Sequence, residues 1–297
     1  MSILEEQMNI WAKAPSETEE TKCQNAVSRI TDTIRKKFGN DVSILLQGSY
    51  KNRTNVRLDS DVDIVVSHQG HFFPGLSNLS PADKEVYHSI YKNSDYTFSQ
   101  FKNDIHIILQ DEFDAGEVER KNKCIKIKGN SYRVNADVVP CYPHRRYRSV
   151  SDVEVEGFGF VGDDGVTVYS FPEQHYDNGV GKNKETEQMY KSLVRILKNV
   201  RNDLVDKGII TLDDMPSFCL ECLVWNVPSE HFIRNRYHDA TRIVLATIWN
   251  EMREFEKSNN YAEVSDLKWL FRGSSKITPK QAENFMQHAW DYIGYEN

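Results

Sequence analysis

The hydrophobic pattern of this chain changes near residue 182, and this change limits the folds that the chain can adopt. Before it, short apolar runs such as VSILL and VDIVVS alternate with stretches of helical periodicity. After it, apolar residues recur at helical spacing in the stretches 184–207, 216–227, 237–257 and 279–293. The sequence therefore predicts an α+β fold, in which residues 1–181 contain both strands and helices and residues 182–297 form a helical lobe.

Local signals predict several elements of the first part. Residues 16–38 should form a helix, because Ser16 and Glu19 match a capping box and Gly39 follows the last apolar position. The runs 42–46 and 62–67 are predicted to be strands, and residues 81–113 to be helical with a break near Asn93 and Ser94. Two hairpins are expected, around Gly129-Asn130 and around the GDDG turn at 162–165.

Composition excludes several classes of protein. The 297 residues can bury a core without disulfides, and five cysteines in a chain of this length fit a reduced, cytoplasmic setting. The N-terminal MSILEEQMNIWAK does not resemble a signal peptide, and no run approaches the roughly 20 apolar residues of a membrane span. The net charge of −7 disfavours a protein whose main task is binding a nucleic-acid backbone. Small phosphate ligands remain compatible with it, and we expect a monomer, with regulatory protein partners left open.

Two aspartates stand at the start of an apolar strand. Asp61 and Asp63 are two residues apart, so on a strand they project to the same face. Two carboxylates that close repel each other unless a cation lies between them, and magnesium is the expected occupant. Asp137, inside the apolar VNADVVP, is the best candidate for a third carboxylate. The three together predict a site for two Mg²⁺ ions, with Mn²⁺ as an alternative.

A Gly-Ser pair precedes these aspartates in the chain. Gly48 allows backbone amides to approach phosphate oxygens closely, and the hydroxyl of Ser49 adds a donor. The simpler interpretation is that Gly48 and Ser49 start a tight turn and that the aspartates are solvated residues at a strand end. The order of the elements, with a buried third aspartate downstream, favours metal-dependent phosphate chemistry over that interpretation.

At these residues the sequence resembles the polymerase-β-like nucleotidyltransferases, whose signature is Gly-Ser, then Asp-x-Asp, then an aspartate in a later strand. It resembles more closely the bacterial cGAS/DncV-like nucleotidyltransferases, which make cyclic di- and trinucleotide signals in anti-phage defence. The matching segments cover most of the organisation of the chain: 45–66, 135–142, 169–201 and 215–228.

The resemblance implies a polymerase-β-like palm, which is a mixed sheet with flanking helices, together with a C-terminal helical lobe and an active site in the cleft between them. It implies a cyclic dinucleotide synthase that joins two nucleoside triphosphates and releases pyrophosphate, with Asp61, Asp63 and Asp137 as catalytic metal ligands. Gln47, Gly48 and Ser49 would bind nucleotide. The implied partners are ATP, with GTP as a second substrate, and no nucleic acid is required.

The resemblance also assigns residues of the helical lobe. Lys198 and Ser217 match positions that contact the triphosphate, and Phe218 matches an aromatic position that stacks on a nucleobase, where most relatives have Tyr. On pattern alone, Lys191, Arg195 and Lys198 form a basic stripe of the kind that usually faces water. The alternative for Phe218 is a core residue beside Leu220 and Leu223.

Ser170 falls at a position that resembles the base-selecting site of the family. Relatives that accept a pyrimidine commonly carry Asn there, and a serine cannot make the same paired contact with a uracil edge. The sequence therefore predicts purine substrates, either ATP alone or ATP with GTP.

Two rival functions and two further motifs remain. The rivals are a transferase that modifies RNA, a protein or a small molecule, and a catalytically inactive nucleotide-binding module. Cys219 and Cys222 are expected to be buried thiols rather than zinc ligands, since no second pair accompanies them. The basic HRRYR at 144–148 is interpreted as a solvated loop, or as a site that grips RNA.

Overall fold

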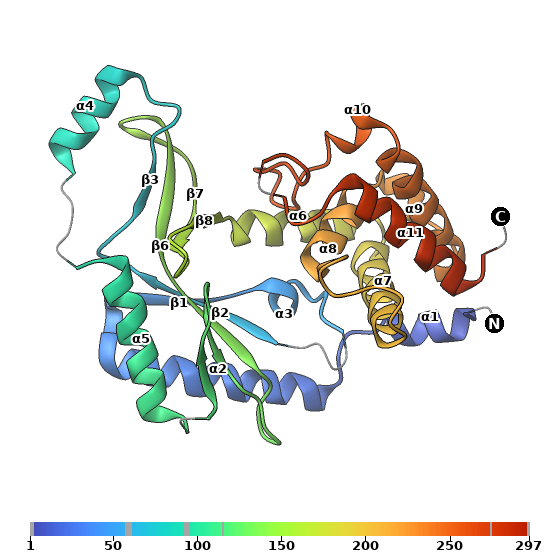
Figure 1. Ribbon diagram of the computed structural model, residues 1–297, viewed down its shortest axis with the longest axis horizontal. Helices are drawn as coiled ribbons and strands as arrows, with labels where there is room; N and C mark the ends of the chain where they lie inside the picture. Colours follow the sequence, from blue (N-terminus) through green and yellow to red (C-terminus); the bar gives the residue numbers. More distant parts are fainter. Residues whose placement is uncertain (1–2, 57–60, 92–95, 115, 274, 296–297) are drawn as a thin grey trace. The chain divides into compact units, whose positions relative to one another are not determined.

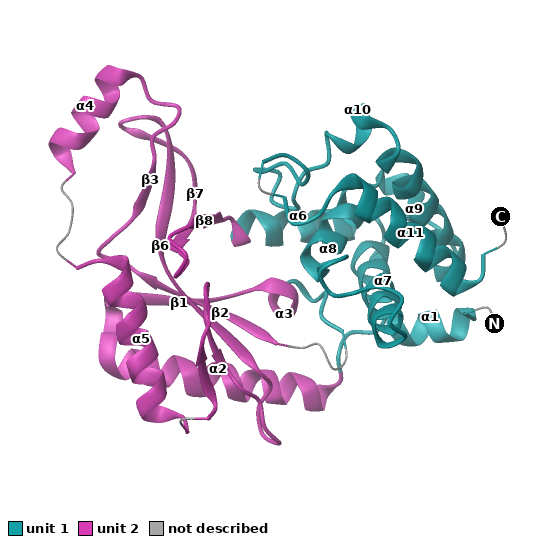
Figure 2. Ribbon diagram, in the orientation of Figure 1, with its two compact units in different colours: residues 1–15, 52–58, 173–297 teal, residues 16–51, 59–172 magenta. Residues whose placement is uncertain are grey.

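The computed structural model describes residues 3–56, 61–91, 96–114, 116–273 and 275–295. The chain forms two compact units, which Figures 1 and 2 show as ribbons. We call residues 16–51 and 59–172 the sheet unit, and residues 1–15, 52–58 and 173–297 the helical unit. The predicted division at 181/182 places every described strand in the first part, but the helical unit starts earlier, at residue 173, and also takes in two early segments of the chain.

The sheet unit is built on a mixed sheet with the strand order β1-β2-β6-β5-β4. The strands β2 and β6 run parallel, whereas β1–β2, β6–β5 and β5–β4 are antiparallel pairs. Their bounds are β1 Val42–Gln47, β2 Val62–His68, β4 Val118–Arg120, β5 Ile125–Ile127 and β6 Ala136–Ser149. The predicted strands at 42–46 and 62–67 and the hairpin around Gly129-Asn130 are confirmed.

The strand β6 is long enough to take part in a second set of pairings. It pairs with β3 (Phe73–Gly75) and with β7 (Asp152–Val161), and β7 pairs with β8 (Thr167–Ser170) to form the second predicted hairpin. The expectation that HRRYR is a solvated loop is wrong, because these residues belong to β6. The strand pattern was hidden by a register shift between Arg146 and Tyr147, which interrupts the alternation of inward and outward side chains.

Helices cover one face of this sheet. Ile30 and Ile34 of α2 (Glu17–Phe38) and Ile105 of α5 (Phe98–Glu112) pack with Val62 and Ile64 of β2. The capping box that predicted α2 is present, since the Ser16 side chain accepts from the Glu19 amide and the Glu19 side chain accepts from Ser16. In the predicted helical stretch 81–113, α4 (Pro81–Ile90) precedes α5, and the predicted break near Asn93 and Ser94 lies outside the described residues. The other helical turns of this unit are η1 (Gly39–Asp41) and α3 (Gly48–Asn52).

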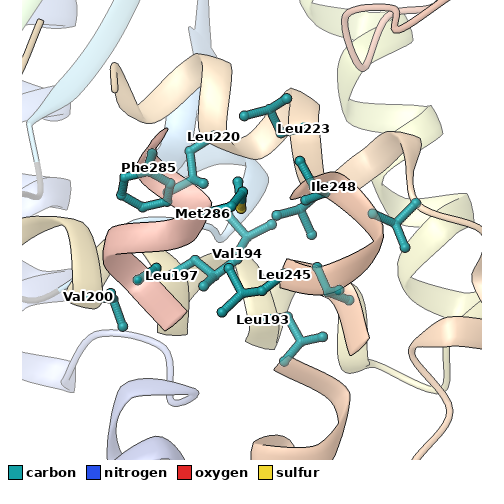
Figure 3. Close-up of a cluster of buried hydrophobic side chains, with 14 of the residues drawn as sticks. Leu193, Val194, Leu197, Val200, Leu220, Leu223, Leu245, Ile248, Phe285 and Met286 are labelled. Carbon is teal, nitrogen blue, oxygen red and sulfur yellow. The ribbon is translucent and has the colours of Figure 1, made fainter. Parts of the chain in front are cut away.

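The helical unit packs around α7 (Met189–Asp206), whose apolar side chains meet those of α8 (Ser217–Asn226), α9 (Tyr237–Met252) and α11 (Pro279–Ile293). Figure 3 shows ten of these labelled side chains, among them Leu197, Leu223 and Phe285, converging from the four helices. The remaining elements are α1 (Glu5–Trp11), α6 (Pro172–Glu185), η2 (Ser229–His231) and α10 (Phe255–Ser258).

Two helices differ from the prediction. The expected helix at 184–207 begins at Met189 instead, because the backbone at Glu187 and Gln188 has positive φ angles of 50° and 70°. Residues 184 and 185 belong to the preceding α6, which the sequence did not predict. The expected helix at 237–257 ends at Met252, and the short α10 follows it. Within the described residues, no helix is both long and apolar enough to cross a membrane.

Candidate active site

The strand register places four polar side chains in one row across the sheet. The row consists of Gln47 of β1, Asp63 of β2, Asp137 of β6 and Lys126 of β5, each paired with the next. Register partners point to the same face of a sheet. Because Val62 and its alternate neighbours point into the core under α2 and α5, the row lies on the opposite face. The aspartates of β2 and β6 are therefore immediate neighbours, as the sequence predicted.

Gly48 lies directly against Asp63. Its φ angle is +70°, and a Cβ atom added to it would lie 1.9 Å from Oδ2 of Asp63. A side chain at this position would displace the Asp63 carboxylate, and the left-handed backbone independently favours glycine. Gly48 and Ser49 then begin the short α3, so the Gly-Ser pair and the Asp63 carboxylate are packed together.

Asp61 is held by two neighbours that the sequence analysis did not anticipate. Lys126 Nζ donates to its Oδ2 over 3.1 Å, and Asn135 Nδ2 donates to its Oδ1 over 2.9 Å. Burial disfavours the charge on Lys126, but the hydrogen bond to Asp61 and the charges of Asp61 and Asp137 outweigh it, so the Lys126 pKa is raised. Lys126 is thus a fixed cation beside the carboxylates.

Asp137 is a half-buried carboxylate in the row. Its Oδ1 is buried and has no hydrogen-bond partner among the residues that the structure describes. Burial raises the Asp137 pKa, Lys126 opposes this shift, and the charge of Asp61 adds to it. A buried, unpartnered carboxylate oxygen is unfavourable unless a further positive group completes the site.

The carboxylates fit a divalent cation in chemistry, but their arrangement differs from the expected cluster of three. No three His, Cys, Asp or Glu side chains in the described part of the chain lie close enough together to hold a metal ion as they stand. Asp63 and Asp137 are adjacent, whereas the oxygens of Asp61 are bound to Lys126 and Asn135. Carboxylate oxygens are nevertheless the ligands that magnesium prefers. One of them, Oδ1 of Asp137, is buried without a hydrogen-bond partner among the described residues.

The basic residues of α7 do not form a water-facing stripe. Lys198 is only 2% exposed, and its Nζ donates to the backbone oxygen of Thr54 over 3.1 Å and to Glu221 Oε2 over 3.4 Å. Arg195 is also buried, and it donates to the backbone oxygens of Ala12 and Arg53. The water-facing interpretation is therefore wrong for these two residues.

Ser217 and Phe218 begin α8 in the same unit as Lys198. Ser217 is half-buried and follows Pro216, which precedes the helix. The half-buried ring of Phe218 packs against the helical core, 5.9 Å from the His175 ring and 5.7 Å from Lys276 Nζ. The environment of Phe218 is therefore partly apolar and partly cationic.

Ser170 shares a sheet face with the carboxylates. It is the last residue of β8 and pairs with Phe158 of β7, which pairs with Pro143 of β6. Pro143 and Asp137 are an even number of residues apart on β6, so their side chains point to the same face. The pairing of β8 with β7 and of β7 with β6 thus places the side chains of Ser170 and Asp137 on the same face of the sheet.

Three of the polar residues found here were absent from the sequence prediction. Glu221 is the one charged residue in the apolar stretch SFCLECLVWN, and that isolation was the available signal. Lys126 stood in an alternating strand but was not connected with the aspartates, and Thr54 gave no signal of its own. Cys219 and Cys222 are buried and free, as expected.

Comparison with known proteins decides the family. A family model described as the cGAS/DncV-like nucleotidyltransferase C-terminal helical domain matches residues 177–294. Over its full length the chain is 45% identical to a cyclic dipurine nucleotide synthase of Elizabethkingia meningoseptica, with 100% of both chains covered. It is also 37% identical to a cyclic dipyrimidine nucleotide synthase, CdnE, of Cecembia lonarensis, over 98% of both. The chain belongs to the cGAS/DncV-like nucleotidyltransferases.

Solved structures agree with this assignment. The structure of Elizabethkingia meningoseptica CdnE cyclic dinucleotide synthase with GTP and Apcpp has a TM-score of 0.83 at 42% identity, covering 99% of this chain and 100% of that one. The Rhodothermus marinus CdnE c-UMP-AMP synthase with Apcpp and Upnpp has a TM-score of 0.84 at 29% identity, covering 99% of each. The predicted family, fold class and enzyme class are confirmed, and this cGAS/DncV-like protein is a nucleotidyltransferase.

Proposed function

We propose that this nucleotidyltransferase is a cyclic dinucleotide synthase, which joins two nucleoside triphosphates, releases pyrophosphate and supplies a signal for anti-phage defence. The observation that carries the proposal is the pair of Asp63 and Asp137 beside Gly48, where a side chain would displace the Asp63 carboxylate. Full-length similarity to named cyclic nucleotide synthases supports it. All five cysteines are free, which supports a reduced, cytoplasmic setting.

Asp61, Asp63 and Asp137 are the proposed ligands of two Mg²⁺ ions, with Mn²⁺ as an alternative. When bound, such ions supply an activated hydroxyl and neutralise charge on the leaving pyrophosphate. Asp63 and Asp137 are held side by side by the strand register, so they provide a fixed pair of oxygen donors. Lys126 and Asn135 orient the carboxylate of Asp61.

The triphosphate is assigned to two groups of residues. The first group is Gln47, which belongs to the row at the end of β1, with Gly48 and Ser49 at the start of α3. In the helical unit, Lys198 and Ser217 are the proposed triphosphate contacts, and Phe218 is the proposed stacking ring. Because the Lys198 ammonium is bound to Thr54 and Glu221, it must exchange or share one of these bonds to reach a phosphate oxygen.

The test of the proposed function needs no acceptor molecule. We expect the purified protein, given labelled ATP and GTP with Mg²⁺ alone, to release pyrophosphate and form a cyclic dinucleotide that is resistant to phosphatase. Mass spectrometry identifies the product. A requirement for added RNA, protein or a small-molecule acceptor would instead support a transferase of another type. Absence of turnover with either metal would support the inactive module.

Base choice is a separate prediction, and it rests on Ser170. Family membership leaves this choice open, since the similar proteins include a dipurine and a dipyrimidine synthase. Ser170 lies on the carboxylate face and offers one short hydroxyl, which cannot pair with a uracil edge as an amide can. We therefore expect a purine product when all four triphosphates are present.

The Ser170→Asn variant should shift product composition toward pyrimidines. The amide adds a paired donor and acceptor, worth about 1–3 kcal/mol of discrimination if it meets the base edge. The measurement is the nucleotide content of the product from an equimolar mixture, before and after substitution. Ser170→Ala is the matched control and should keep the purine preference. A uridine-rich product from the unsubstituted protein would refute the role of Ser170 and leave the enzyme class unaffected.

A further inference from the structure

The segment that joins the Gly-Ser pair to the aspartates belongs to the helical unit. Residues 52–58 are grouped with that unit, although Gly48 and Asp63, on either side of the segment in sequence, belong to the sheet unit. The described part of the segment, residues 52–56, is largely buried, and Thr54 is 0% exposed. A connection between two elements normally runs over the surface, so burial of this one requires specific partners.

Thr54 is bound by a buried network of charged side chains. Its hydroxyl donates to Glu221 Oε2 over 2.8 Å, and its backbone oxygen accepts from Lys198 Nζ over 3.1 Å. The second carboxylate oxygen of Glu221, Oε1, lies 3.0 Å from His175 Nε2. Both oxygens of a carboxylate that is only 4% exposed are therefore occupied, and one of the bonds reaches the segment. A fully satisfied buried network fixes geometry because any displacement leaves a charge without a partner.

A second contact fixes the neighbouring residue. Arg195 Nη1 donates to the backbone oxygen of Arg53 over 2.6 Å, while its Nε donates to the backbone oxygen of Ala12 over 2.7 Å. The backbone of Arg53 has a φ angle of +54°, which a non-glycine residue rarely adopts. A strained backbone persists only where surrounding contacts hold it, so the helical unit imposes a particular path on this segment.

We propose that Thr54 and Glu221 are positioning residues for nucleotidyl transfer, and this proposal rests on the proposed function. They hold the segment 52–56 in place, and the segment is joined covalently to Ser49 on one side and to Asp61 on the other. A few residues of chain have a short reach, so an anchored segment limits the positions available to both of its ends. Thr54 and Glu221 thereby restrain the phosphate-binding pair and the metal-binding pair together, without touching substrate themselves.

The test uses three threonine variants in the full chain. Thr54→Val keeps the shape of the side chain and removes the donor to Glu221, whereas Thr54→Ser keeps the donor. Thr186→Val is the matched control, since Thr186 is also 0% exposed in the helical unit and its hydroxyl donates to the backbone oxygen of Lys182 over 2.8 Å. For each variant we would measure Tm, kcat and KM for ATP, and the half-saturating Mg²⁺ concentration, well below the lowest Tm.

The expected result separates positioning from a purely structural role. Both valine variants should lower Tm, but only Thr54→Val should lower kcat, by about tenfold, and raise the Mg²⁺ requirement. Thr54→Ser should stay within about twofold of the unsubstituted protein in kcat, because it retains the charge-assisted hydrogen bond. The proposal is wrong if the Tm of Thr54→Val falls as that of Thr186→Val does while its kcat and Mg²⁺ requirement equal those of the unsubstituted protein.

Amide hydrogen exchange tests whether the network anchors residues 52–56 without relying on enzymatic activity. A failure of this proposal can therefore be distinguished from a failure of the proposed function. In Thr54→Val the peptide that spans residues 52–56 should exchange at least about tenfold faster than in Thr186→Val. If the unsubstituted protein makes no cyclic dinucleotide, the enzymatic proposal fails, and the exchange rates still test whether the network anchors the segment. Equal exchange in the two valine variants would overturn the anchoring.

Discussion

Replacing Asp61 and Asp63 together with asparagine should abolish product formation, with a loss of at least about 10³-fold in turnover. Asparagine has nearly the same shape as aspartate but carries no charge, so it binds a divalent cation far more weakly. The fold should remain intact. The ion pair between Asp61 and Lys126 is partly exposed, with 39% and 29% of the two side chains accessible, and such pairs contribute at most about 1 kcal/mol.

The measurement is the rate of pyrophosphate release at saturating ATP and Mg²⁺, together with Tm for each protein. Asp104→Asn is the matched control, because Asp104 is a carboxylate of the sheet unit that accepts from the Tyr96 hydroxyl, away from the row. It should keep the rate of the unsubstituted protein. A double variant that turns over at that same rate would show that Asp61 and Asp63 do not hold the catalytic metal.

The parts of the fold that the sequence predicted are those set by local interactions. Ser16 and Glu19 are close in the chain, so the capping box and the helix that it starts were readable without any tertiary information. Asp63 lies on the face of β2 opposite Val62 and Ile64, as strand periodicity predicts, whereas Asp61 precedes the strand and its shared face with Asp63 stays a prediction. Asp137 was found because a carboxylate within an apolar strand is unusual, and its Oδ1 is indeed buried.

The parts that were missed depend on pairing between distant segments. Lys126 reaches Asp61 only because the register of β5 on β6 places it beside Asp137, and composition does not determine register. The register shift between Arg146 and Tyr147 also arises from pairing with another strand. Because it interrupts the alternation of side chains, the sequence did not predict a strand in the second half of β6. Spacing on a helix shows which residues share a face, but it does not show what covers that face, which is why Arg195 and Lys198 were misread.

The site in the helical unit was predicted incompletely because it is a network rather than a motif. Thr54, His175, Lys198 and Glu221 come from four separate segments, and no local pattern in the sequence connects them. Their association becomes visible only when residues 52–58 are seen to fold with the helical unit. The predicted domain boundary at 181/182 excluded that segment, so the partners of Glu221 could not be inferred.

The Glu221→Gln variant should lower the free energy of unfolding by about 3–5 kcal/mol, because it leaves the buried ammonium of Lys198 without its counter-charge. Burial by itself raises the Glu221 pKa, but the charge of Lys198 and the hydrogen bonds from His175 and Thr54 outweigh it and lower the pKa to about 2. The carboxylate therefore stabilises the folded state while it is ionised. Urea unfolding of the two proteins at neutral pH measures the difference.

The same substitution should also change how stability depends on pH. A carboxyl group whose folded pKa lies below its ordinary value of 4.5 contributes its full stabilisation above that value and loses it as the pH falls toward about 2. A shift of this size corresponds to about 3 kcal/mol, and that part of the acid dependence should be missing from Glu221→Gln. The double variant Glu221→Gln, Lys198→Met should recover much of the loss at neutral pH, since both buried charges are then absent. If Glu221→Gln alone unfolds at the same urea concentration as the unsubstituted protein, Lys198 does not depend on Glu221 for its burial.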